Sequence, residues 1–243
     1  MLPKITMKLN KLNPTGRMGV LQHLAELRSR IIRSSLAVAV GTIIGWVFYP
    51  EILSFILDPY CQTLGTDCTL RVDEPLEGLN TRFMVSIYTG VALAIPVWLW
   101  QFWKFISPGL YKKEKEGARG FIFISSTLFF IGVLFGYYVV TPLSINFLGN
   151  YTISSEVFND FDLNSYIGLL RASVLASGLI FELPIIIHYL TKVGLVTPDF
   201  LRRNRKFALV IVLSLSAIIT PPDIASQIIV SIPILVLYEI SII

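Results

Sequence analysis

The sequence predicts an all-α membrane protein with six transmembrane helices and with both termini in the cytoplasm. Three observations support this. The 243 residues are 54% hydrophobic and only 15% charged, with a mean hydropathy of +0.69, whereas about a quarter of the residues in a soluble domain are charged. Six apolar runs approach the roughly 20 residues needed to cross about 30 Å of hydrocarbon. The basic residues gather on one side of these runs.

The apolar runs define the predicted helices in order. They cover residues 31–49, 83–103, 121–141, 166–190, 207–220 and 224–243. We expect a single six-helix transmembrane domain over residues 1–243, with a cytoplasmic amphipathic arm at 1–30 and a long outer loop at 50–80. The fifth run spans only about 21 Å at 1.5 Å per residue, so the bilayer must thin there or flanking basic side chains must reach outwards.

Charge orients the bundle, because short cytoplasmic loops are enriched in Lys and Arg. Of the 20 basic residues, 17 lie on the side of the N-terminus, and the opposite side has only Arg71 and Arg82. Both termini are therefore predicted to be cytoplasmic. No cleavable signal peptide is expected, since the first apolar run begins beyond residue 30. The net charge of +4 reflects topology and does not indicate nucleic-acid binding. The chain ends at YEISII without a polar tail, which favours a trimmed C-terminus.

The outer side is predicted to be acidic and solvated. Its carboxylates are Glu51, Asp58, Asp67, Asp73, Glu74, Glu77, Glu156, Asp160 and Asp162. Both cysteines, Cys61 and Cys68, fall in the first outer loop. An oxidising exterior would permit a disulfide between them, and two free thiols are equally compatible with the sequence.

Ionisable residues inside the apolar runs are the strongest intrinsic hint of function, because charges in hydrocarbon are costly. Glu182 lies roughly 12 Å below the cytoplasmic end of the fourth helix. Arg171 lies on the same helical face but roughly 16 Å away, so the two side chains cannot pair directly. Each one either finds a polar partner within the bundle or lines a functional cavity.

The segment HLAELRSR at residues 23–30 places a carboxylate among arginines. On a helix, Glu26 and Arg30 share a face, and Leu24 and Leu27 lie on the other. Taken alone, this pattern predicts an amphipathic start to the first helix with an exposed ion pair. A second carboxylate, Glu114, also lies among lysines. On this side the acids are far outnumbered by the 17 cations.

Other functional classes remain open at this point. A small-solute secondary transporter is the main alternative, and it would show internal repeats and broken helices around a midplane site. An intramembrane enzyme would need a catalytic constellation within the spans. The sequence offers only His23 and His188 and no aspartate deep in a span, so we expect no catalytic residues, no metal and no cofactor.

Several motifs resemble one family in the same order along nearly the whole chain. They are HLAELRSR at 23–30, FISPGLYKKEK at 105–115, FELP at 181–184 and TPPD followed by SQ at 220–227. These look like the motifs of TatC, the multispanning subunit of the twin-arginine protein translocase. The chain departs from the family in its bare C-terminus, where the family continues into a short basic tail, and in its outer-loop cysteines.

The resemblance implies a receptor for signal peptides that carry two consecutive arginines. It implies a core subunit of a translocase that exports folded proteins across the cytoplasmic (inner) membrane, driven by the proton gradient. The implied partners are the signal peptides of folded cargo and single-span subunits of the TatA and TatB kind, in an oligomeric complex within the bilayer. No nucleic acid is implied.

Family positions also match particular residues. Glu26 and Glu114 match the carboxylates that bind the twin arginines, and Glu182 matches an intramembrane glutamate. The neighbouring recognition positions are matched by Leu24, Arg28, Phe105, Pro108 and Lys112. Further functional positions are matched by Pro59 in the outer loop and by Asp223 and Gln227 at the start of the last helix.

The resemblance gives a physical meaning to the isolated carboxylates. A peptide with two arginines avoids a cationic surface unless specific acceptors are present, and guanidinium groups form strong, often bidentate bonds with carboxylates. Two acids in a repulsive field would therefore favour a peptide that places a charge at each and disfavour other basic sequences.

Overall fold

The computed structural model describes residues 20–64, 69–106, 118–151, 161–192, 194–221 and 223–242. Within these residues the chain is helical, and the only extended pairing is an isolated bridge between Arg71 and Asp162. The all-α prediction is therefore confirmed. The helices are α2 (Val20–Val47), α3 (Tyr49–Leu64), α4 (Glu77–Ile106), α6 (Ala118–Phe135), the π-helix η2 (Gly136–Val140), α7 (Thr141–Asn150), α8 (Leu163–Phe181), α9 (Leu183–Lys192), α10 (Pro198–Arg203), α11 (Arg205–Ile219) and α12 (Ile224–Ile242).

In the described part of the chain, five stretches are long and apolar enough to cross a membrane. They are Leu24–Val47, Glu77–Phe102, Ile122–Asn150, Leu163–Lys192 and Ile224–Ile242. The remaining predicted span corresponds to α11, which has 15 residues and a length of about 22 Å, short of the roughly 30 Å hydrocarbon core. The structure thus agrees with a multi-pass membrane protein, and α11 is as short as the sequence predicts.

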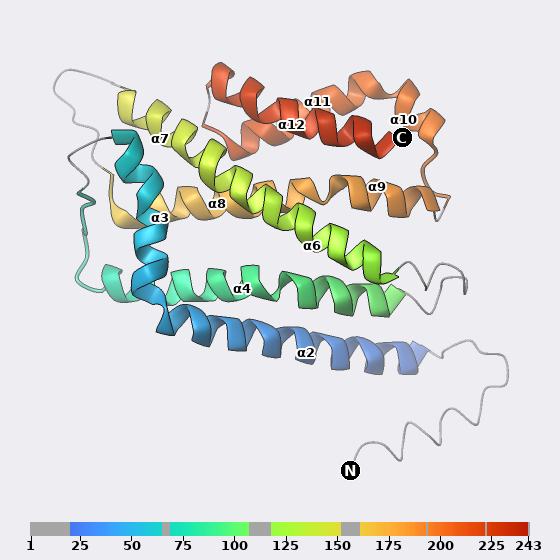
Figure 1. The fold of residues 1–243 in the computed structure, drawn as a ribbon, viewed down its shortest axis with the longest axis horizontal. Helices are drawn as coiled ribbons and strands as arrows, with labels where there is room; N and C mark the ends of the chain where they lie inside the picture. The colour runs from blue at the N-terminus through green and yellow to red at the C-terminus, as the bar shows by residue number, and fades with distance from the viewer. Residues whose placement is uncertain are drawn as a thin grey trace, which may run out of the picture.

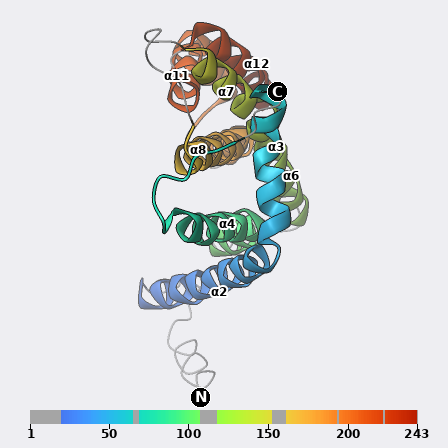
Figure 2. The ribbon, with the colours of Figure 1, turned by 90° about the vertical axis from the view of Figure 1, so that its left-hand side faces the viewer.

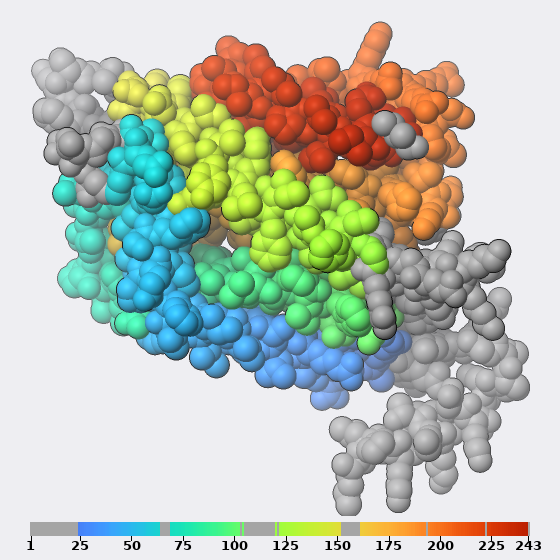
Figure 3. Space-filling model, viewed as in Figure 1, coloured from blue at the N-terminus to red at the C-terminus, as the bar shows by residue number. Residues whose placement is uncertain are grey.

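The long helices lie side by side along the long axis of the molecule, whereas α3 crosses them at one end (Figure 1). The view along this axis shows α2, α4, α8 and the α11–α12 pair in a curved row, with α3 and α6 along one side (Figure 2). In the space-filling view, α3, α6, α7 and α12 cover much of the near face (Figure 3).

The two ends of the bundle carry opposite charges. The start of α2 and the ends of α4, α9 and α12 lie at the same end of the molecule (Figure 1). This is the basic end, with Arg28, Lys104, Lys192 and Arg203. The other end holds α3, the start of α8 and the α11–α12 turn (Figure 1). It is the acidic end, with Glu51, Asp58, Asp73, Glu74 and Asp162.

The structure adds detail to two predicted segments. Residues 20–30 of the predicted arm are helical and continuous with the first span, as α2 runs from Val20 to Val47. The predicted outer loop at 50–80 contains the helix α3 and the first turn of α4. The apolar side chains Ile52, Leu53, Ile56 and Leu57 of α3 pack on a buried core. This helix lies across the bundle end, so it lacks the long apolar run by which the spans were recognised.

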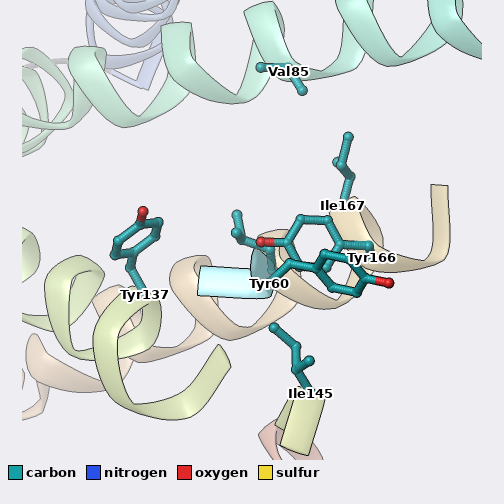
Figure 4. Packing of buried hydrophobic residues seen from close by; sticks show 7 residues of the cluster. Tyr60, Val85, Tyr137, Ile145, Tyr166 and Ile167 are labelled. Carbon is teal, nitrogen blue, oxygen red and sulfur yellow. The ribbon is translucent and has the colours of Figure 1, made fainter. Parts of the chain in front are cut away.

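The core beneath α3 is built from tyrosines of three segments. Tyr60, Tyr137 and Tyr166 are buried together with Ile145 (Figure 4). Tyr137 donates to the Phe55 carbonyl, and Tyr166 likewise donates its hydroxyl to a carbonyl of α3. Buried tyrosine hydroxyls need such acceptors. These bonds fix α3 across the ends of η2 and α8.

Glycines allow two helix pairs to approach closely. A Cβ atom at Gly132 of α6 would lie 2.6 Å from the Ser177 carbonyl oxygen of α8, and one at Gly41 of α2 would lie 2.9 Å from the Gly90 Cα of α4. Small residues at such spacing bring helix backbones into contact in membranes, where packing replaces the hydrophobic effect between helices.

The predicted helix at 166–190 is interrupted at Glu182, which lies between α8 and α9. The cause is Pro184, which has no backbone N–H and whose ring clashes with the carbonyl four residues earlier. The break places the Glu182 side chain against α6.

Candidate functional site

An ion pair within α2 lies at the basic end, and its arginine is also bonded to the last turn of α4. The Arg30 guanidinium pairs with Glu26 Oε1, and its Nη2 also donates to the Lys104 carbonyl oxygen at 2.9 Å. The last four carbonyls of a helix lack intrahelical partners. Arg30 therefore supplies a donor that the end of α4 needs, while it holds the Glu26 carboxylate in place.

The Glu26–Arg30 pair is confirmed, but the prediction that it is exposed is wrong. The Glu26 and Arg30 side chains are 22% and 13% exposed, whereas Leu24 and Ile31 are 54% and 56% exposed. Glu26 and Arg30 thus pack towards α4, whereas Leu24 and Ile31 are largely exposed. In a membrane this orientation is reasonable, because lipid can cover the apolar face and the α4 carbonyls require polar partners.

The second oxygen of Glu26 is available for another donor. Glu26 Oε2 is buried and accepts no hydrogen bond from the described part of the chain. A buried acceptor without a donor costs about 1–3 kcal/mol. What this carboxylate lacks is therefore a hydrogen-bond donor, and a guanidinium group would supply one.

An apolar cavity adjoins the ion pair between α2 and α4. Its volume is about 220 Å³. Its walls are Leu27, Arg30, Ile31, Ser34, Ser35, Trp98, Gln101 and Phe102. A ligand with a cationic group at Glu26 could place a neighbouring apolar side chain in this cavity.

The other predicted recognition positions are only partly described. Leu24 and Arg28 are exposed on the second turn of α2, and Arg28 has no partner among the described residues. Phe105 lies in the last turn of α4, and its side chain is outside the described part of the structure. The predicted residues Pro108, Lys112 and Glu114 also lie outside the described residues.

Glu182 is far from this end cluster and has a partner within the bundle. Its side chain is 8% exposed, and Oε2 accepts a hydrogen bond from the Ser125 hydroxyl of α6. Oε1 is buried and unpartnered among the described residues. Arg171 instead donates to the Tyr88 hydroxyl of α4. The two ionisable groups do not pair, as the sequence predicts.

The remaining predicted positions lie at the acidic end. Pro59 is buried within α3. Asp223 caps α12 by accepting from the Ser226 backbone N–H at 2.8 Å, as predicted, and bonds from Ser226 hold the pKa of the Asp223 carboxyl below its ordinary value. Gln227 Nε2 donates to the Leu213 carbonyl of α11 at 2.9 Å. The predicted residues that the structure describes thus occupy three separate places along the bundle.

Comparison with known proteins identifies the family. The model of the family described as Sec-independent protein translocase protein (TatC) matches residues 22–233. The chain belongs to the TatC family. A TatC protein of Desulforapulum autotrophicum is 38% identical over 91% of this chain and 82% of its own length. One from Helicobacter pylori strain 26695 is 37% identical over 90% of this chain and 84% of its own length.

Solved TatC structures share the fold. A crystal structure of the twin-arginine translocase receptor TatC has a TM-score of 0.75 and 36% identity, and it covers 90% of this chain and 96% of its own. A second, in the detergent DDM, has a TM-score of 0.77 at the same identity, with 90% and 97% covered. Membership of the TatC family confirms the predicted resemblance and the assignment to twin-arginine protein transport.

One buried glutamate of this chain has a structural role that the sequence does not predict. Glu77 was predicted to be a solvated outer acid, but it is only 3% exposed. Its carboxylate accepts backbone N–H groups of Asp73 at 2.7 Å, Glu74 at 3.3 Å and Asn164 at 3.0 Å. Glu77 therefore ties the loop before α4 to the start of α8. A glutamate in a first helical turn that reaches back to preceding N–H groups is the signal that could have revealed it.

The cysteine question is also answered in part. Cys61 on α3 is disulfide-bonded, which agrees with the disulfide alternative of the sequence analysis. Cys68 lies outside the described residues.

Proposed function

We propose that this chain is a receptor for signal peptides with two consecutive arginines, which it binds at the basic end. The observation that carries the proposal is the Glu26 carboxylate beside an apolar cavity. It is held by Arg30, and one of its buried oxygens has no donor among the described residues. The site combines an acceptor for a guanidinium group with space for an apolar side chain. The similarity to solved structures of the twin-arginine translocase receptor TatC supports this proposal.

Glu114 is the proposed acceptor for the second arginine. A charge-assisted bond between a guanidinium and a carboxylate contributes about 1.5–3 kcal/mol. Arg28 and Lys112 would repel basic peptides that do not place charges at the two acids. Leu24, Phe105 and Pro108 would contact the residues that flank the arginines.

The proposed topology puts the basic end and both termini in the cytoplasm, with α11 as a short sixth span of the inner membrane. Its support is the segregation of basic residues. Labelling of single cysteines introduced at Arg203 and at Asp73, with a reagent that cannot cross the membrane, tests this. We expect labelling from outside at Asp73 only; labelling at Arg203 would contradict the topology.

Within this topology the chain would act with TatA-like and TatB-like single-span subunits to export folded proteins, driven by the proton gradient. Glu182 is the proposed intramembrane functional group. Pro59, Asp223 and Gln227 are proposed functional positions towards the outer face. A folded reporter behind a twin-arginine signal peptide distinguishes this from solute transport: export should require both the chain and the two arginines.

Direct binding tests the receptor proposal. One signal peptide, in Arg-Arg and Lys-Lys versions, is titrated against the parent protein and against Glu26→Gln and Glu114→Gln variants. Each substitution should weaken Arg-Arg binding roughly ten-fold, as expected for a loss of about 1.4 kcal/mol. The matched controls are Glu116→Gln and Asp199→Asn, which remove the same charge outside the motif positions. Equal small losses in all four variants would contradict specific recognition.

A further inference from the structure

Arg171 is an exposed arginine within a membrane span. It lies eight residues after the first residue of α8, or about 12 Å along the helix axis, on the half of the span towards the acidic end. Its guanidinium carbon lies 4.9 Å from the centre of the Tyr88 ring, and Nη1 donates to the Tyr88 hydroxyl. Tyr88 lies eleven residues after Glu77 along α4, at a similar or greater depth.

The positive charge of Arg171 is not neutralised by the described part of the chain. The Tyr88 hydroxyl in turn lies 3.7 Å from the Met84 sulfur. Both groups are uncharged, so neither balances the positive charge of Arg171. The acids of the described span helices have other partners: Glu26 pairs with Arg30, Glu182 accepts from Ser125, Glu77 accepts backbone N–H groups and Glu239 pairs with Arg205. A second copy of these described segments therefore offers no accessible carboxylate at the depth of Arg171, because Glu26 and Glu239 lie at the basic end and Glu77 and Glu182 are buried.

An uncompensated guanidinium in hydrocarbon is unfavourable, and such groups mark contacts with partners or wet pathways. A long basic side chain near a helix end can reach the headgroups. Here the two contacts with Tyr88 hold the guanidinium against α4, and Arg171 lies about 12 Å along α8 from its first residue. This geometry favours a carboxylate at the same depth over a lipid phosphate at the surface.

The surface next to Arg171 has room for another helix. Gly168 and Ala172 flank Arg171 on α8, and a Cβ atom at Gly168 would meet no atom within 4 Å. Ala172 is exposed. Small residues allow a neighbouring backbone to approach closely in a membrane, and the arginine supplies a charge that selects which helix does so.

We propose that the α4–α8 surface around Arg171 binds a transmembrane helix of a different subunit, one that carries an aspartate or glutamate in the half of its span towards the acidic end. The carboxylate would pair with the Arg171 guanidinium while the Tyr88 ring keeps the guanidinium in place. This inference rests on the proposed assembly with single-span subunits and identifies one contact within it.

The test uses the full chain produced together with its single-span subunits in membranes. A photo-crosslinking residue replaces Ala172, in the parent and in Arg171→Lys, Arg171→Gln and Arg171→Leu backgrounds. The same residue at Ile218, which is 81% exposed on α11, is the control site. We expect an adduct between position 172 and a single-span subunit, mapped by mass spectrometry near an Asp or Glu of its span. Its yield should fall roughly ten-fold in the Gln and Leu backgrounds and be largely retained with Lys, while the yield at position 218 stays unchanged.

The inference is overturned if position 172 crosslinks only to lipid or to a second copy of the chain, or if the subunit adduct is unaffected by loss of the charge. Size-exclusion profiles show whether each variant folds. If Arg171→Leu does not fold, the conclusion is drawn from Arg171→Gln, whose side-chain amide can still bond to the Tyr88 hydroxyl. Co-purification of the single-span subunits with the parent chain tests the assembly proposal separately. Without co-purification both proposals fail; with it, an unchanged adduct removes only the Arg171 contact.

Discussion

The Ser125 hydroxyl on α6 donates a hydrogen bond to the Glu182 carboxylate in the break between α8 and α9. The contact joins the two helices that Gly132 brings together. Glu182 is therefore held by protein at its Oε2 atom, and only 8% of the residue is exposed. Replacement of either partner changes a buried polar contact inside the bundle.

We predict that Ser125→Ala destabilises the protein. The substitution leaves the buried Glu182 carboxylate without its hydrogen-bond donor, which costs about 1–3 kcal/mol. Thermal unfolding in detergent measures this. Thr127→Ala is the control, because Thr127 is exposed and its hydroxyl donates only to the Phe123 carbonyl of its own helix. Equal effects of the two substitutions would show that the Glu182 contact has no special weight.

Glu182→Leu is predicted to impair transport more than signal-peptide binding. Among the described residues, Glu182 is the acid that lies near the middle of the bundle. Glu26 lies instead at the basic end. Reporter export and peptide binding, measured with the same membranes, separate the two effects. Unchanged export in the Leu variant would eliminate Glu182 as an intramembrane functional group.

Close packing of α6 on α8 gives a third prediction. Gly132→Ala places a Cβ atom 2.6 Å from the Ser177 carbonyl oxygen and 2.9 Å from the Gly178 Cα, so a helix must shift, at about 1–3 kcal/mol. Gly120→Ala on the same helix meets no atom within 4 Å and should gain helix stability of up to about 1 kcal/mol. Opposite shifts in melting temperature are expected, and a neutral Gly132→Ala would contradict the packing.

The sequence predicts the spans well because their apolar composition follows directly from contact with lipid. It also predicts the Asp223 cap and the Glu26–Arg30 pair, which are local. It fails for α3 and Glu77, because their roles depend on contacts with residues distant in the chain, such as Tyr166 and Asn164. The inward orientation of Glu26 depends on the end of α4, which a helical wheel of α2 does not contain.

Asp162 makes stability depend on pH. It caps α8 by accepting the Ser165 N–H at 3.0 Å, and the side-chain and backbone bonds from Ser165 lower the pKa of the Asp162 carboxyl below 3.8. The pKa of Asp162 is thus lower in the folded protein than in the unfolded chain. The contribution of this cap to the free energy of unfolding is therefore fully present above the unfolded pKa, and it is lost as the pH falls through the folded pKa. Asp162→Ala should cost about 1 kcal/mol at neutral pH.

Thermal unfolding of the parent and of Asp162→Ala at pH 7, pH 5 and about pH 3 checks this expectation, with the gap in melting temperature narrowing at the lowest pH. Asp162→Asn is the control, because asparagine is a good cap that does not titrate. A gap between the parent and Asp162→Ala that is the same at every pH would show that the ionised cap contributes nothing.

The last prediction concerns Arg30 as a positioning residue for signal-peptide binding. Arg30→Leu removes one positive charge and changes no other charge. Electrostatics alone therefore predicts that this substitution relieves repulsion and improves binding of a basic peptide. The geometry predicts the reverse. Arg30 fixes the Glu26 carboxylate and bonds the Lys104 carbonyl at 2.9 Å, so its loss frees Glu26 to rotate away from the cavity between α2 and α4. Arg-Arg peptide binding should weaken several-fold, and Arg30→Lys, which keeps the charge without the planar fork, should restore only part of it.

Arg33→Leu is the matched control, because Arg33 is exposed on the same helix and has no partner among the described residues; its replacement should leave binding unchanged or slightly stronger. Peptide titrations of the three variants decide the matter, since equal gains from Arg30→Leu and Arg33→Leu would reduce Arg30 to a background charge.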